Sequence, residues 1–103
     1  MTEKKRLTHD LVAIKAAFSS AATLHRTMGS ARDAAALGMD ASDVVEVIQA
    51  LEYPGDFDKS ATAHHDRRQW HDSYKPVVAG VRLYLKFTVD AEGVFLLTSF
   101  KEA

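Results

Sequence analysis

One apolar segment near the end of this 103-residue chain carries a regular set of polar residues whose types could do chemistry. Between residues 81 and 89, leucine, phenylalanine and valine alternate with polar side chains, as in a strand with one buried face. A turn at residues 90–93 and a returning strand over 94–101 complete the expected antiparallel hairpin. Its face away from the core presents Arg82, Tyr84, Lys86, Ser99 and Lys101.

Lys59 and His71 lie in two preceding predicted strands. Together with this cationic face, they supply the residue types that a metal-free phosphodiester-cleaving site needs. Cleavage of RNA by its own 2′-hydroxyl needs one group to take the 2′ proton, one to protonate the 5′-oxygen, and cations to stabilise the phosphorane. Histidine carries protons near neutral pH, and lysine and arginine neutralise developing charge. Tyrosine can donate a proton, bind a phosphate or stack on a base. Exposed strand faces also carry such residues without any catalytic role, so the pattern alone leaves both interpretations open.

A second cluster, His64-His65-Asp66 followed by His71-Asp72, contains residue types that bind metal ions. Adjacent residues of a strand point to opposite faces, so His64 and His65 are not expected to bind one ion. Their spacing matches no zinc pattern, and the chain has no P-loop, no GxSxG and no HExxH. We therefore expect no metal and no cofactor, and a metal hydrolase built on His64, Asp66 and His71 is a distant alternative.

The hairpin register decides which of these side chains are neighbours. A loop at residues 90–93 pairs Val89 with Val94, and a three-residue loop would shift that pairing. The expected pairing sets Tyr84 opposite Ser99, Arg82 opposite Lys101, and Lys86 beside Leu97.

The elements that position these residues change near residue 52 from predicted helices to predicted strands. Helical spacing and capping residues dominate the first half, where residues 22–27 fit either a short strand or an irregular link. The candidate N-caps are Thr8, Ser30 and Asp40, and a short helix is expected to end at Leu37 before Gly38. The buried positions of the first and third helices are Leu11, Ile14 and Phe18, and Val44, Val45, Val47, Ile48 and Leu51.

The second half carries the pattern of strands. The expected strands cover residues 57–64, 69–74, 81–89 and 94–101, in a three- or four-stranded antiparallel meander. Three N-terminal helices packed on such a sheet make an α+β fold. We expect one domain over residues 1–103, with residues 1–6 as a flexible basic tail.

Charge is distributed unevenly along the chain although the net charge is −1. Residues 1–32 carry a net +4, residues 33–58 a net −7, and residues 59–103 a net +2. The acidic block coincides with the predicted helices, so we expect it to lie away from the face of Lys59, Tyr84 and Lys101. The chain has no cysteine, no signal-peptide pattern and no apolar run near the roughly 18 residues of a membrane span, so we expect a cytoplasmic protein without a membrane partner.

Several stretches, in their order along the chain, resemble the MqsR (motility quorum-sensing regulator) family of toxins from type II toxin–antitoxin systems. They are AAALGMD at 34–40, VVEVIQAL at 44–51, DFDKS at 56–60, WHDSYKP at 70–76, LYLKFTV at 83–89 and SFKE at 99–102. The resemblance implies a RelE-like fold and ribosome-independent, metal-independent cleavage of mRNA at GCU-like sites. It also implies a cognate DNA-binding antitoxin as partner, and we expect the free toxin to be monomeric.

The resemblance carries the family's active-site residues onto Lys59, Tyr84 and Lys101, which the hairpin pattern also selects. We expect Lys59 and Lys101 to bind phosphate, Tyr84 to position it or transfer a proton, and His71 to act as an acid–base group. Arg82 and Lys86 are candidate charges for steering the substrate.

The chain departs from the family pattern at three positions near this site, where it has Asp58, Ala61 and His71. An imidazole at position 71 can move a proton where the family's glutamine cannot. Asp58 places an anion beside Lys59, although strand alternation predicts that it points to the other face. Asp58 and Ala61 favour the alternative of a diverged, non-catalytic module that binds an antitoxin or RNA.

Overall fold

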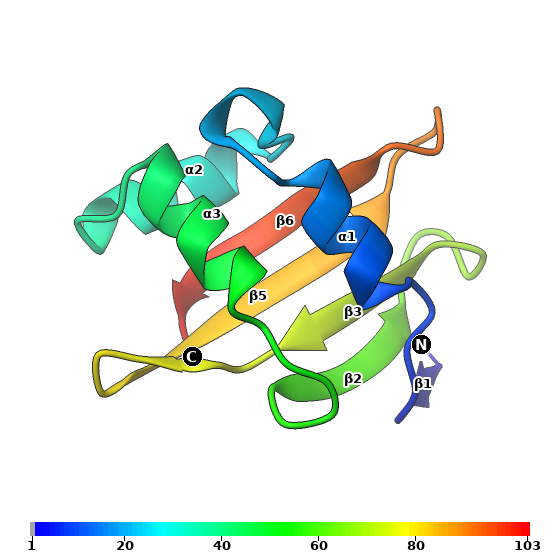
Figure 1. Ribbon diagram of the computed structural model, residues 1–103. Coiled ribbons are helices and arrows are strands. Elements are labelled where there is room, and N and C mark those ends of the chain that lie inside the picture. The colour runs from blue at the N-terminus through cyan, green and yellow to red at the C-terminus, as the bar shows by residue number, and fades with distance from the viewer. Residues whose placement is uncertain (1) are drawn as a thin grey trace.

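The computed structural model describes residues 2–103, and three helices pack on one face of an antiparallel sheet in it (Figure 1). The helical elements are α1 (Leu11–Ala17), the 3₁₀ turn η1 (Ala21–Thr23), α2 (Met28–Ala36) and α3 (Ala41–Gln49). The strands are β1 (Glu3–Lys4), β2 (Phe57–Thr62), β3 (Trp70–Tyr74), β4 (Val77–Val78), β5 (Val81–Val89) and β6 (Phe95–Glu102). This arrangement confirms the predicted α+β class, with N-terminal helices and a mainly C-terminal sheet. Within residues 2–103, no helix combines the length and the apolar character needed to cross a bilayer.

The sheet has six strands instead of the three or four predicted, because two strands of only two residues escape the sequence pattern. Strand β1 pairs with β2, and β2, β3 and β5 follow in antiparallel order, with β6 on the other side of β5. Strand β4 continues the line of β3 along β5 after an interruption at Pro76, which has no N–H to donate. A two-residue turn with positive φ at Ala79 and Gly80 then leads back into β5.

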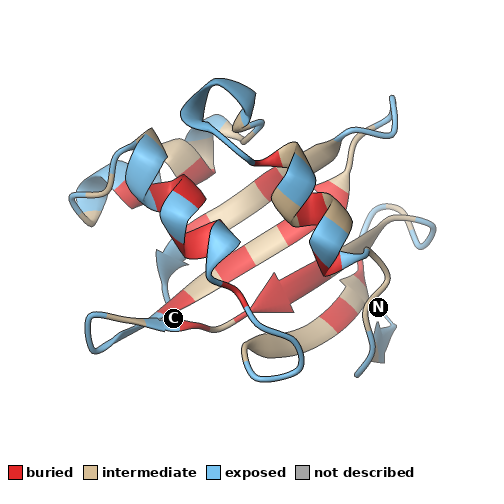
Figure 2. Ribbon diagram, viewed as in Figure 1, coloured by how far each residue is buried: buried red, intermediate tan, exposed pale blue. Residues whose placement is uncertain are grey.

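The core lies between the helices and the sheet, as the buried segments of Figure 2 show. Leucine and phenylalanine of β5 and β6 meet the apolar sides of α1 and α3 there, and the outer faces of the helices are exposed. The fully covered core side chains include Ile14, Phe18, Val44, Ile48, Leu83, Leu85, Phe87, Leu97 and Phe100. The predicted buried positions of the first and third helices are confirmed.

Two of the three predicted helix caps are wrong. Helix α1 is capped by Asp10, which accepts from the N–H of Val12, and not by Thr8. Helix α2 is capped by Thr27 and not by Ser30, whose hydroxyl donates to the carbonyls of Thr27 and Leu97 from inside the helix. Before α1, the backbone N–H groups of Thr8 and His9 are bonded to the Asp72 carboxylate, so the helix begins only after Asp10. Asp40 caps α3 as predicted, in a capping box with Asp43.

Residues 21–27 form η1 and an irregular link, with one isolated parallel bridge between Arg26 and Leu97. The predicted strands at 57–64, 69–74 and 94–101 are confirmed with shifted ends, and the one at 81–89 matches β5.

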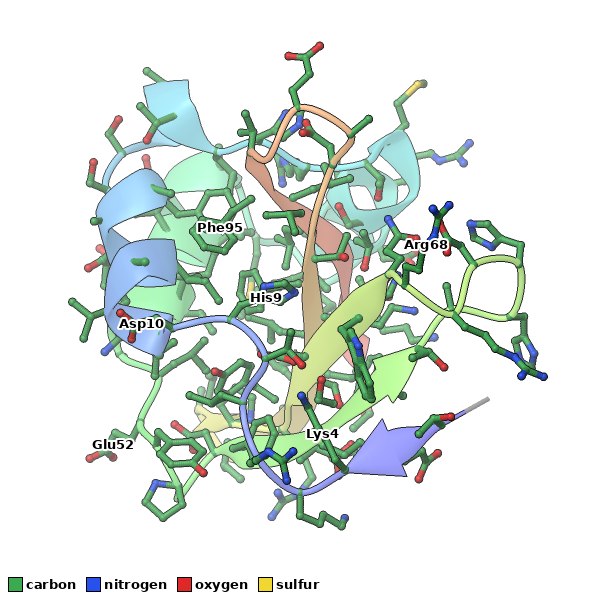
Figure 3. The ribbon with its side chains drawn as sticks, turned by 90° about the vertical axis from the view of Figure 1, so that its right-hand side faces the viewer. Lys4, His9, Asp10, Glu52, Arg68 and Phe95 are labelled. Atoms are coloured by element: carbon green, nitrogen blue, oxygen red, sulfur yellow. The ribbon has the colours of Figure 1, made fainter. Side chains whose placement is uncertain are left out.

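Residues 3 and 4 of the N-terminal segment pair with the sheet, whereas the sequence predicted a flexible tail over residues 1–6, of which residue 1 lies outside the described residues. Glu3 and Lys4 pair with Ala61 and Ser60 of β2, and Lys4 Nζ lies 4.3 Å from the centre of the Trp70 ring. Figure 3 shows Lys4 on this strand and His9 between α1 and the sheet, near Phe95.

The buried carboxylate of Asp72 in β3 fixes the chain just before α1. It accepts from the backbone N–H groups of Thr8 and His9, at 3.0 and 2.8 Å. His9 adds a contact from its Nε2 to the carbonyl of Trp70 at 3.0 Å.

Candidate active site

The β5–β6 hairpin carries the predicted polar face, but in a register that differs from the prediction. Its loop holds five residues, so Val89 pairs with Phe95 instead of Val94. Thr98 then forms a bulge, which shifts the pairing by one residue more. The observed pairs at this end are Lys86 with Ser99 and Tyr84 with Lys101.

The two shifts together return the predicted residues to the predicted face. Side chains alternate with a period of two along a strand, so one shift exposes the wrong face and a second restores it. Leu85 and Phe100 therefore remain a buried pair, while Tyr84, Lys86, Ser99 and Lys101 share the opposite face. The predicted partners of Tyr84, Arg82 and Lys86 are wrong, and the predicted composition of the face is right.

A row of lysine and serine crosses four strands on this face. Lys59 of β2 pairs with Ser73 of β3, Ser73 pairs with Lys86 of β5, and Lys86 pairs with Ser99 of β6. Paired residues on one face have Cβ atoms about 4.5–5.5 Å apart, so the row spans roughly 14 Å of surface. Lys59, Lys86 and Ser99 of this row are partly exposed, whereas Ser73 is buried.

A pocket of about 420 Å³ opens on this face over β2, β3 and β5. It brings together four of the predicted site residues and adds two histidines of the β2–β3 loop. Its polar lining consists of Lys59, Thr62, His64, His65, His71, Ser73, Tyr84 and Lys86. A second hollow of about 490 Å³ is lined by Lys75, Tyr84, Lys86, Ser99, Lys101, Glu102 and Ala103. Tyr84 and Lys86 belong to both, so the predicted Lys101 adjoins the pocket instead of lining it.

His71 is the half-buried acid–base candidate of the pocket. Both of its ring nitrogens are shielded and have no hydrogen-bond partner within residues 2–103. Burial lowers the pKa of His71 below its ordinary 6.5, and the positive charges of Lys86, His65 and His9 lower it further, against the effect of Asp72. The imidazole is therefore neutral near pH 7, and both of its nitrogens are covered by the surrounding protein.

Lys59 does not stand free in the pocket. Its Nζ donates to Glu3 Oε2 of β1 at 2.7 Å, and this hydrogen bond is the main reason why the pKa of Lys59 is raised. Asp58 adds to the negative potential, because a β-bulge at Asp58 turns its carboxylate toward the site. Its Oδ2 accepts from the hydroxyl of Ser73 at 3.0 Å, so the expectation that Asp58 points to the other face is wrong.

The two remaining predicted residues, Lys101 and Arg82, lie in different surroundings. Lys101 is exposed and its Nζ lies 5.8 Å from the centre of the Tyr84 ring, close enough for a cation–π contact. Arg82 lies at the start of β5, outside both hollows, and donates to the carbonyl of Lys75 at 3.0 Å. The structure thus gives Arg82 a local structural contact apart from the other site residues.

The histidine cluster does not assemble into a metal site. Within residues 2–103, no group of three histidine, cysteine, aspartate or glutamate side chains is placed to hold a metal ion. His64 and His65 line the pocket from the β2–β3 loop, while Asp66 accepts from the backbone and guanidinium N–H groups of Arg68.

Sequence reasoning missed Ser73 and Glu3. Ser73 lies two residues after His71 in the same strand, so strand alternation would have placed it on the face. Glu3 has no comparable signal, because its contact with Lys59 depends on the pairing of β1 with β2.

Comparison with known proteins agrees with this arrangement. A family model described as "Motility quorum-sensing regulator, toxin of MqsA" matches residues 6–102. The mRNA interferase toxin MqsR of Escherichia coli (strain K12) is 32% identical over 99 residues, which cover 96% of this chain and 98% of that protein. Because the family model matches nearly the whole chain and this relative is 32% identical over 96% of it, the chain belongs to the MqsR toxin family.

Proposed function

We propose that this protein is a toxin of a type II toxin–antitoxin system that cleaves mRNA as a metal-independent endoribonuclease. The observation that carries the proposal is the common pocket of Lys59, His71, Tyr84 and Lys86 on the sheet face opposite the helices. Two of these residues lie at positions where the chain resembles the family's active site. The name of the Escherichia coli relative, an mRNA interferase, supports the same class of substrate.

The proposed chemistry is attack of a ribose 2′-hydroxyl on the adjacent phosphate. Neutral His71 is the acid–base group for the 2′ proton, once RNA binding uncovers one of its unpartnered ring nitrogens. Lys59 and Lys101 bind the phosphate and stabilise the added negative charge of the phosphorane. Tyr84 positions the phosphate from beneath Lys101.

The test is incubation of the purified protein with a defined RNA in the presence of EDTA, followed by mapping of the cuts and their ends. We expect cuts that survive the chelator, need no ribosome and leave a 2′,3′-cyclic phosphate. Cleavage that EDTA abolishes and zinc or manganese restores would replace the proposal with a metal-dependent hydrolase. A pool of RNAs with every trinucleotide would show whether the cuts fall at GCU-like sites, as we propose.

A non-catalytic binding module is the second candidate, and one observation favours it. Glu3 is hydrogen-bonded to Lys59, where a phosphate would have to displace it, and Asp58 adds a second negative charge nearby. Expression in the cytoplasm with and without the cognate DNA-binding antitoxin separates the two candidates. A nuclease arrests growth unless the antitoxin is present, whereas a pure binder does not.

A further inference from the structure

Lys86 occupies the centre of the candidate site. It is the third member of the row that runs from Lys59 to Ser99, with Ser73 on one side and Ser99 on the other. It also lines both hollows of the face, which meet at Lys86 and Tyr84. A phosphate bound in either hollow is therefore in reach of the Lys86 ammonium.

The surroundings of Lys86 differ from those of the other lysines in the row and beside it. Lys86 has no carboxylate partner among residues 2–103, whereas Lys59 is paired with Glu3. Burial lowers the pKa of Lys86 below 10.5, and the positive charge of Lys101 lowers it further, while the pKa of Lys59 is raised. Lys86 is thus the more acidic of these two ammonium groups and gives up a proton more readily.

We propose that Lys86 is the general acid that protonates the leaving 5′-oxygen, an assignment that rests on the proposed RNA cleavage. In this step the 2′-oxygen forms a bond to phosphorus and its proton passes to a ring nitrogen of His71. The bond from phosphorus to the 5′-oxygen breaks, its electron pair stays on that oxygen, and the oxygen takes a proton from Lys86 Nζ. The products are a 2′,3′-cyclic phosphate and a 5′-hydroxyl, and water returns the proton from His71 to Lys86.

Other charged and titratable groups share this face, so a pH profile alone does not identify the acid. The groups from each neighbouring element are Lys59 of β2, His71 of β3, Lys75 after β3, Tyr84 of β5, Lys101 and Glu102 of β6, and His64 and His65 of the β2–β3 loop. Each of them would affect binding of any RNA phosphate. Loss of the general acid slows departure of the 5′-oxygen. It does not slow departure of a group that needs no proton, which distinguishes it from loss of a phosphate-binding residue.

The experiment compares a normal RNA with the same RNA carrying sulfur in place of the 5′-oxygen at the cut. A thiol has a pKa of about 8.5, so the thiolate leaves without a proton. We expect the Lys86→Arg variant to cleave the oxygen substrate about 10²–10³ times more slowly than the unmodified protein, since a guanidinium keeps the charge and does not give up its proton. The same variant should cleave the sulfur substrate within about fivefold of the unmodified protein, since general-acid catalysis makes little contribution there.

The unmodified protein provides a second measurement that does not depend on a variant folding. Its kcat/KM for the oxygen substrate should fall as the pH rises, with a midpoint below pH 10.5. Its kcat/KM for the sulfur substrate should not show this decrease. Equal slowing of both substrates in Lys86→Arg, or equal alkaline limbs in the unmodified protein, would overturn the assignment. The Lys15→Arg variant, which makes the same change at a lysine of α1, is the matched control and should cleave both substrates normally.

Failure of the assignment is distinguishable from failure of the proposed function. An unmodified protein that cleaves neither substrate contradicts the nuclease itself. If the unmodified protein cleaves both substrates and the Lys86→Arg variant cleaves each of them as fast as the unmodified protein does, only the role of Lys86 is contradicted.

Discussion

His71 and Lys59 illustrate how single side chains acquire their properties from what surrounds them. The imidazole of His71 is shielded without a partner, which keeps it neutral, while the ammonium of Lys59 is held by Glu3. The first arrangement prepares a proton acceptor and the second restrains a phosphate-binding cation. Each predicts a measurable effect of one substitution.

We expect His71→Ala to lower RNA cleavage by about 10²–10⁴, the usual contribution of an acid–base group. Because burial lowers the pKa of His71, the base stays unprotonated and active as the pH falls to 6.5 and below. The acidic limb of kcat/KM should therefore lie below pH 6.5 in the unmodified protein and be absent from the residual activity of the variant. His25→Gln, which changes an exposed histidine paired with Asp90, is the control and should retain both activity and acidic limb.

We expect Glu3→Gln to strengthen binding of a non-cleavable 2′-O-methyl RNA by up to about fivefold. A partly exposed ion pair contributes about 0–1 kcal/mol, and this is the interaction that a phosphate must displace from Lys59. Fluorescence anisotropy titrations measure the change. Glu92→Gln makes the same change of net charge in an exposed loop, and an equal gain in that variant would show that Glu3 has no specific effect.

At the level of elements, the site depends on two bulges and one anchored segment. The bulges at Asp58 and Thr98 set which side chains of β2 and β6 face the pocket. The anchored segment is the chain before α1, held by the Asp72 carboxylate through the N–H groups of Thr8 and His9. Asp72 thus ties the N-terminal segment and the start of the helix layer to the strand that carries His71.

We expect Asp72→Ala to lower the free energy of unfolding by about 2–4 kcal/mol, because two backbone N–H groups lose a charged acceptor in a buried place. Urea unfolding followed by circular dichroism measures the loss. Asp66→Ala removes a carboxylate that is bonded only within its own loop, and we expect a change below about 0.5 kcal/mol. Similar losses in the two variants would contradict the anchoring role of Asp72.

For the whole molecule, the sheet separates charge of opposite sign. The acidic helix α3, with Asp43 and Glu46, covers one face of the sheet (Figure 1), whereas Lys59, Lys86 and Lys101 line the two hollows of the other face. The expectation that the acidic helices lie away from the cationic face is confirmed for α3. The exceptions are Glu3 and Asp58, which reach the site from β1 and from the β2 bulge.

We expect the logarithm of the RNA association constant to fall with the logarithm of salt concentration with a slope of about −2, as for three phosphates on a single strand. Lys101→Ala should reduce the steepness by about 0.7, since it removes one phosphate contact. Glu46→Lys on α3 adds a positive charge to the other face and should leave the slope unchanged. A steeper slope in Glu46→Lys would mean that RNA also contacts the helices.

The sequence by itself determined what depends on local spacing. Alternation along residues 81–89 put Leu85 on one face and Tyr84 and Lys86 on the other, and the Asp40 cap with its apolar stripe defined α3. The order of short motifs predicted the family before any geometry was known. These features need only neighbours along the chain, within one strand or one helix.

Only the tertiary structure decided the features that depend on distant parts of the chain. The partner of Tyr84, the contact between Glu3 and Lys59, and the turn of Asp58 toward the site all follow from pairing between separate strands. The lowered pKa of Lys86 follows from burial and from Lys101 across the hairpin. Loop length, bulges and desolvation are set when the whole sheet assembles, so residue spacing predicted the members of the site but not their partners or their proton affinities.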